Sequence, residues 1–96
     1  MSKYVALVRW TAEGIKEAKD SPKRLDRAHE LAKAEGVFFD AFYMVMGDCD
    51  MVAILDAPND AALARFVLRL SSTGAVSTKT MKAFTEDEYR SIMAAL

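Results

Sequence analysis

The chain has 96 residues and a net charge of −1, from 13 lysines and arginines against 14 aspartates and glutamates. Hydrophobic residues make up 52% of the chain, with only four glycines and two prolines. These values predict one compact domain over residues 1–96 and exclude disordered and fibrous classes. A chain so close to neutral also lacks the concentrated positive charge of a general nucleic-acid binder.

Cysteine usage and hydropathy bear on the cellular compartment. The only cysteine, Cys49, cannot form an internal disulfide, which favours a reducing environment. The apolar run near the start is interrupted by Arg9 and has no small-residue cleavage site, so it does not resemble a signal peptide. No run approaches the ~18 apolar residues that cross a bilayer. We therefore expect a cytoplasmic protein with no membrane partner.

The first half of the chain predicts one strand and a helical segment in two pieces. Residues 4–10 are rich in strand-forming side chains. Thr11 is placed to cap a helix that runs to about residue 20. A second helix then begins with Ser21 as its N-cap and Pro22 at its first helical position, and Gly36 ends it.

The second half predicts a hairpin, a helix, a strand and a final helix. Residues 37–46 and 51–57 are strand-like and flank a turn at 47–50. A helix follows the cap at 58–60 and ends at Gly74, and residues 75–84 form the last strand. The final helix begins with a capping box of Thr85 and Glu88. The apolar stripes of the two helices consist of Leu63, Phe66, Val67 and Leu70, and of Tyr89, Ile92, Met93 and Leu96.

The order β-α-β-β-α-β plus a C-terminal helix indicates an α+β fold of the ferredoxin-like, split βαβ type. This topology has an antiparallel four-stranded sheet with both crossover helices on one face. A monomer of this kind should carry polar residues on the other face.

The predicted strands are instead apolar on both faces, as strict alternation along them shows. Such a face is too large to leave in water, so we expect a homodimer that packs face to face. The alternative is that the C-terminal helix folds back over the second face. The opposed sets are Tyr4, Ala6, Val8 and Trp10 against Val5 and Leu7; Phe39, Ala41, Tyr43 and Val45 against Phe38, Phe42, Met44 and Met46; and Met51, Ala53 and Leu55 against Val52 and Ile54.

Four segments in the same order resemble the GYD domain family, over about residues 3–92. They are Val-Arg-Trp-Thr-Ala-Glu-Gly at 8–14, Asp-Ser-Pro-Lys-Arg at 20–24, Met-Gly-Asp-Cys-Asp at 46–50 and Lys-Ala-Phe-Thr-Glu-Asp-Glu at 82–88. Cys49 occupies the place of the tyrosine in the Gly-x-Tyr-Asp-like hairpin for which the family is named. The resemblance implies a dimeric α+β barrel, in which two ferredoxin-like sheets close on one another, and it implies no particular chemistry.

Two groups of side chains are candidates for ligand binding. Trp10 and Tyr43 lie on predicted strands, and each has an apolar ring with a polar group that can form a hydrogen bond. Arg9 directly precedes Trp10 in the first of these strands. Ser21, Lys23 and Arg24 lie at a helix start, where backbone N–H groups suit anions. The structural interpretations are ordinary packing for the first group, and for the second a solvated helix face with i, i+4 pairs such as Asp20 with Arg24.

The remaining polar residues favour structural roles. His29 has no neighbouring His or Cys with which to form a metal site, and the acidic neighbours Asp48 and Asp50 disfavour a reactive Cys49 thiolate. Both aspartates suit closure of the hairpin turn. We expect no metal and no cofactor, and no catalytic residue can be assigned.

Two functions fit these observations. The first is a homo-oligomeric module of the GYD type that binds a small ligand or supports an assembly, since the chain has no nucleophile–base pair or phosphate loop. The second is a cofactor-independent enzyme, like a monooxygenase or a dehydratase, that acts on a small aromatic or acidic metabolite in the barrel. A cavity below ~300 Å³ in the dimer would argue against the enzyme.

Overall fold

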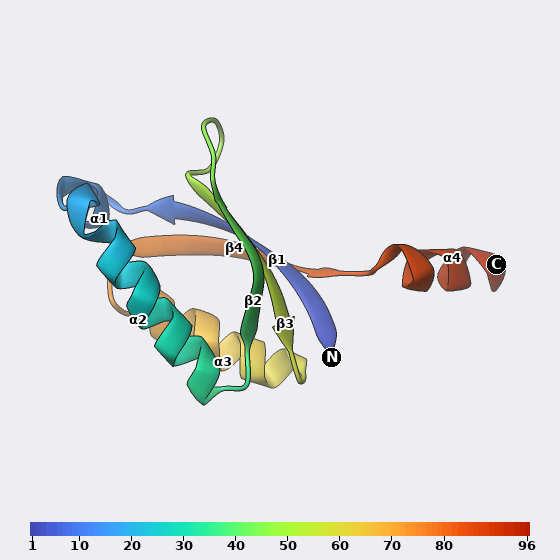
Figure 1. The fold of residues 1–96 in the computed structure, drawn as a ribbon. Coiled ribbons are helices and arrows are strands. Elements are labelled where there is room, and N and C mark those ends of the chain that lie inside the picture. Colours follow the sequence, from blue (N-terminus) through green and yellow to red (C-terminus); the bar gives the residue numbers. More distant parts are fainter.

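The computed structural model describes residues 1–96. Its elements are β1 (Ser2–Trp10), α1 (Ala12–Lys16), a short 3-10 helix η1 (Ala18–Asp20), α2 (Ser21–Ala34), β2 (Phe38–Met44), β3 (Met51–Ala57), α3 (Asp60–Ser71), β4 (Val76–Ala83) and α4 (Glu86–Ala94). The strands form one antiparallel sheet in the order β2-β3-β1-β4. Helices α2 and α3 lie on the same side of it (Figure 1). This arrangement confirms the predicted ferredoxin-like split βαβ fold.

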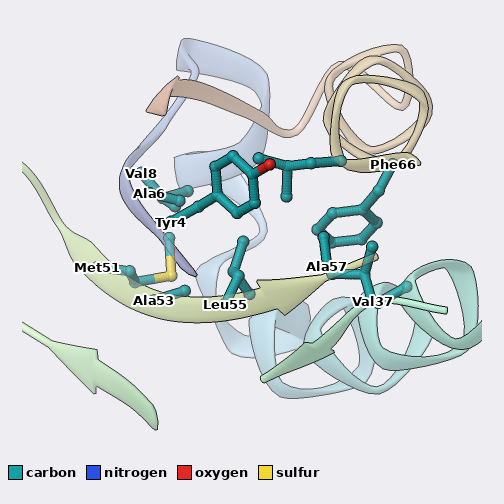
Figure 2. Close-up of a cluster of buried hydrophobic side chains, with 11 residues drawn as sticks. Tyr4, Ala6, Val8, Val37, Met51, Ala53, Leu55, Ala57 and Phe66 are labelled. Atoms are coloured by element: carbon teal, nitrogen blue, oxygen red, sulfur yellow. The ribbon is translucent and has the colours of Figure 1, made fainter. Parts of the chain in front are cut away.

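The core lies between the sheet and these two helices. Tyr4, Ala6 and Val8 of β1 and Met51, Ala53 and Leu55 of β3 are all buried on the helix side. Figure 2 shows them together with Val37, Ala57 and Phe66. The predicted alternation of β1 and β3 is therefore confirmed, because each buried residue alternates with a half-buried one on the other face.

Strand β2 departs from the predicted alternation. Its pairing with β3 shifts between Phe39 and Ala41, so Asp40 is an extra residue in the ladder. Such a bulge moves the following side chains to the other face. Phe39 consequently shares the helix side with Phe42, whereas Phe38 shares the opposite side with Ala41 and Tyr43. The predicted grouping of Phe38 with Phe42 was wrong for this reason.

The helix boundaries follow capping residues that are visible in the sequence. Asn59 accepts a hydrogen bond from the backbone N–H of Ala62 at 2.8 Å and so begins α3. Thr85 and Glu88 form the predicted capping box of α4. At α2 the cap position is held by Asp20 rather than Ser21, so the helix begins one residue earlier than predicted. None of the helices has the length and apolar character needed to span a membrane.

Helix α4 stands clear of the rest of the chain (Figure 1). Every residue from Glu86 to Leu96 is exposed, and the molecule measures 49 × 30 × 17 Å. The alternative in which this helix folds back over the second sheet face is therefore wrong. That face, which we call the open face, has no cover from its own chain. Its apolar side chains are Val5, Leu7, Phe38, Ala41, Tyr43, Val52, Ile54 and Met81.

The turn from β1 into α1 depends on a close backbone approach at Gly14. Thr11 caps α1 through Gly14 N–H, and Thr11 N–H donates to the carbonyl of Ala75 at 3.0 Å. A Cβ at position 14 would collide with that same carbonyl oxygen. Glycine is thus required at position 14 because no side chain fits there. Its backbone angles are ones that any residue can adopt, so they do not require glycine.

The substitution Gly14→Ala should therefore destabilise the fold. Because the methyl group meets backbone rather than a flexible side chain, α1 must move away from the start of β4, at a cost of about 2 kcal/mol. Urea unfolding followed by circular dichroism measures this. An unfolding free energy equal to that of the wild type would contradict the close approach.

Candidate functional site

A cavity of about 220 Å³ lies between the sheet and the helices α2 and α3. Its walls are mostly apolar and include Phe39, Phe42, Phe66 and Leu70. No carboxylate, imidazole, thiol or phenol lines it. It is therefore a largely apolar binding site rather than a cluster of reactive groups.

Small side chains create the hollow. Ala6 and Ala53 pair across β1 and β3, and Ala28 of α2 also lines the cavity. All three are buried. Larger residues at these positions would fill the space that the aromatic walls enclose.

The polar part of the lining comes mainly from the beginning of α2. Ser21, Arg24 and Arg27 contribute from that helix, and Thr73 and Thr78 contribute from the segments leading into and along β4. Helix α2 has no side-chain hydrogen bond at its cap, but the Ser21 N–H already donates to the carbonyl of Ala18 and Pro22 carries no N–H. The positive charge at this end of an otherwise apolar site therefore comes from Arg24 and Arg27.

Arg24 is held in place by main-chain carbonyls. Its Nη1 donates to the carbonyl of Glu17 at 3.1 Å and its Nη2 to that of Gly14 at 2.9 Å. Its Nε is buried and has no hydrogen-bond partner. The predicted ion pair with Asp20 is absent, because the guanidinium turns toward the carbonyls of Gly14 and Glu17 instead.

Three of the six residues predicted to bind ligand come together here. Trp10 Nε1 donates to Ser21 Oγ at 3.3 Å, which joins the end of β1 to the start of α2 beside Arg24. Ser21 and Arg24 line the cavity, and Trp10 packs against the core next to it.

The other three lie elsewhere. Arg9 and Tyr43 are exposed on the open face, on the far side of the sheet from the cavity. Lys23 is exposed on α2 and does not line the cavity.

The remaining polar candidates occupy surface positions. His29 is exposed on α2, with its ring centroid 4.3 Å from that of Phe39. The Asp50 side chain accepts a hydrogen bond from Trp10 N–H at 3.0 Å, and its own N–H donates to the carbonyl of Val8. Asp50 therefore has a structural role, but its side chain fastens the hairpin turn to β1 rather than closing the turn itself, as was predicted.

Neither the alanines nor the aromatic walls were among the residues predicted to bind a ligand. Alternation groups Ala6 with Tyr4 and Val8 and groups Ala53 with Met51 and Leu55, but because both faces of the strands are apolar it does not show which face meets the helices. That Ala6 and Ala53 lie opposite each other depends on the register between β1 and β3, which the sequence does not give. The place of Phe39 in the wall depends on the bulge in β2.

A second, open hollow of about 410 Å³ lies where α3 borders β4. Tyr4 donates a hydrogen bond from its hydroxyl to the carboxylate of Asp60 there, and Lys82 lies 5.1 Å from the centroid of the Tyr4 ring. Burial, and secondly the bond to Asp60, raise the pKa of the Tyr4 hydroxyl above 10.0. This contact joins β1 to the first turn of α3.

The raised pKa of Tyr4 predicts how the stability lost in Tyr4→Phe, relative to the wild type, changes with pH. Tyr4 keeps its proton in the folded state at a pH where the unfolded state loses it, so its stabilisation is complete below pH 10.0 and is lost as pH rises further. Tyr4→Phe should cost about 1 kcal/mol at neutral pH, and this cost should shrink above pH 10.0. Urea titrations of both proteins across this range measure the difference. A cost that stays constant with pH would contradict the raised pKa.

Comparison with known proteins places this geometry in a family. The model of the GYD domain matches residues 4–93. The chain belongs to the GYD domain family. A relative from Thermus thermophilus, named "Glutamine synthetase and cystathionine beta-lyase binding protein", is 33% identical over 84 residues, which cover 86% of this chain and 88% of the relative.

Solved structures share the fold at low sequence identity. The Mycobacterium tuberculosis leucine response regulatory protein LrpA superposes with a TM-score of 0.65 at 18% identity, covering 88% of this chain. A feast or famine regulatory protein of the same organism, complexed with L-methionine, gives 0.66 at 18% over the same share. The GYD chain spans about half of each, 51%. TTHA0845 of Thermus thermophilus gives 0.57 at 22%, covering 88% of this chain and 95% of the other.

Proposed function

We propose that this GYD protein is a single α+β domain that forms a homodimer in the cytoplasm and binds a small apolar ligand. The observation that carries the proposal is the cavity between the sheet and the helices. Its 220 Å³ are walled by aromatic and aliphatic side chains, with a few polar groups at the start of α2. Apolar hollows with a small number of placed polar groups are typical of small-molecule sites.

The chemistry of the lining favours binding over catalysis. A cofactor-independent enzyme needs a group that takes or gives a proton within hydrogen-bond reach of its substrate. The polar side chains that line the cavity are hydroxyls and guanidiniums, which are poor general bases at neutral pH. The enzyme hypothesis therefore has less support from this site than the binding hypothesis.

The surface of the single chain supports a dimer. The accessible area is 6531 Å², whereas a compact monomer of this mass exposes about 5,500 Å². The excess, about 1,000 Å², is close to the ~800 Å² that each partner buries in a typical stable interface. The open face and α4 both contribute to this excess, since Phe38 is 56% and Tyr43 61% exposed on the open face and every residue of α4 is exposed.

Helix α4 gives a second reason to expect a partner. An isolated helix of fewer than ~12 residues is marginal in water, and α4 has nine. Its apolar side chains Tyr89, Ile92 and Met93 share one face, and all are exposed. The capping box determines where α4 starts but does not bury this face. We propose that α4 packs against the second copy.

A second candidate function is the binding of other proteins. The name of the Thermus thermophilus relative describes a protein that binds two enzymes, and this chain shares 33% of its residues over the aligned region. In that function the exposed apolar face of α4 would contact such a partner instead of the second copy.

Filling the cavity tests the ligand-binding proposal. Ala28→Leu should place a larger side chain into the cavity and abolish the chemical-shift changes that toluene, a neutral apolar probe, causes at Ala6 and Phe66. Ala64→Leu is the matched control, because Ala64 is exposed on α3 and does not line the cavity. Two-dimensional NMR measures the shifts. The absence of any toluene response in the wild type would contradict a ligand cavity.

Charge on the open face tests the dimer. The wild type should show twice the chain mass of 10.6 kDa by light scattering, and Ile54→Lys should show the monomer mass. A lysine there buries an unpaired charge in the proposed interface. Leu68→Lys is the control, because Leu68 is 69% exposed on α3, away from the open face. A wild type that stays at the monomer mass at micromolar concentration would overturn the dimer.

A further inference from the structure

The cavity has apolar walls but a positive end. Arg24 and Arg27 both line it, and no aspartate or glutamate does. Neither arginine takes part in any of the ion pairs of the structure. A guanidinium beside apolar space and without a carboxylate partner favours an anion that brings its own apolar body.

The geometry of Arg24 shows which atom meets this anion. Both Nη atoms are occupied by the carbonyls of Glu17 and Gly14, which hold the guanidinium plane in place. The buried Nε–H has no acceptor. A buried donor without a partner is costly, so a ligand oxygen at Nε gains a charge-assisted hydrogen bond and relieves that cost. Because Nε is shielded from water in this structure, a ligand oxygen that binds it has to displace the side chains that cover it.

Ser21 adds a second donor at the same end of the cavity. Its hydroxyl oxygen accepts from Trp10 Nε1, which leaves the hydroxyl hydrogen free to donate. The guanidinium and the hydroxyl thus both favour one negative group at this end of the cavity.

We propose that the cavity binds a small monocarboxylate with an apolar body, whose carboxylate pairs with Arg24 and Ser21. This inference rests on the proposed small-ligand function and names the chemical class of the ligand. A dry cavity of ~150 Å³ accommodates benzene, so 220 Å³ accommodates a ring or branched chain of about five to seven carbons together with a carboxylate.

The same lining disfavours amino acids. An α-ammonium group beside Arg24 and Arg27 is repelled, and no acidic side chain of the cavity pairs with it. The expected ligand therefore differs from the L-methionine found with the feast or famine regulatory protein, although the two proteins share a fold.

The experiment compares three probes of similar shape by NMR titration of the full chain. They are 4-methylpentanoate, its neutral amide 4-methylpentanamide, and L-leucine, which adds the ammonium group. 4-Methylpentanoate should bind at least about tenfold more tightly than the amide, which has no charge to form a charge-assisted hydrogen bond. It should also bind at least about tenfold more tightly than leucine, whose ammonium group is repelled by the arginines. Shift changes should include the backbone amides of Ser21 and Arg24.

Paired variants locate the charge. Arg24→Gln should lower the affinity for 4-methylpentanoate about tenfold and leave that for the amide unchanged. Lys23→Gln is the matched control, because it removes one positive charge from the residue before Arg24, and this residue is exposed and outside the cavity. Since Arg24 also holds the end of α1, Arg27→Gln provides a second charge removal at a side chain for which the structure shows no hydrogen bond.

The outcomes separate this inference from the proposed function. Equal binding of carboxylate and amide, or a Lys23→Gln loss as large as that of Arg24→Gln, overturns the carboxylate assignment and leaves the apolar cavity as a ligand site. Binding of none of the three probes, together with no response to toluene, overturns the small-ligand function itself. Tighter binding of leucine than of 4-methylpentanoate overturns the argument from charge.

Discussion

The structure depends on a four-stranded sheet that is apolar on both faces and covered by helices on only one. Covering the helix side produces the core around Leu55 and Phe66 and, next to it, the cavity. The open face is left with half-buried aliphatic side chains and two exposed aromatic ones. Both proposed activities of this GYD protein follow from that asymmetry, since the covered side offers a small-molecule site and the open side offers an interface.

The cavity results from two independent features of the chain. Facing alanines on β1 and β3 leave space, and the beginning of α2 supplies charge to that space. The charge is held in place by the end of α1, through the carbonyls of Gly14 and Glu17. Gly14 therefore has two structural roles, because it allows α1 to approach the start of β4 and it orients Arg24. The connection between β1 and α2 is thus part of the site as well as of the fold.

Local patterns in the sequence were sufficient to predict the order of the elements and the fold, although the first helix ends at Lys16 rather than near residue 20 and is followed by the 3-10 helix η1. Capping residues such as Asn59 and Thr85 act within one helical turn, so their effect can be seen without the structure. The bulge at Asp40 could not be seen in this way, because it is defined only by the pairing of β2 with β3. The same reason explains which residues of the site could be predicted. Ser21 and Arg24 were predicted because they lie at a helix start, which is a local pattern. Ala6 and Ala53 lie opposite each other only because of the register between β1 and β3, which the sequence does not give.

The bulge in β2 also bears on how copies of the chain associate. β2 and β4 are the two edges of the sheet, and an unprotected edge invites another strand to pair with it. At β2 the extra residue interrupts the regular ladder and carries the charge of Asp40, which pairs with Lys3. At β4, Lys79 and Lys82 are exposed. Both edges are therefore poor templates for strand addition, so the proposed dimer is expected to form through the sheet faces rather than by pairing of edge strands into open-ended fibres.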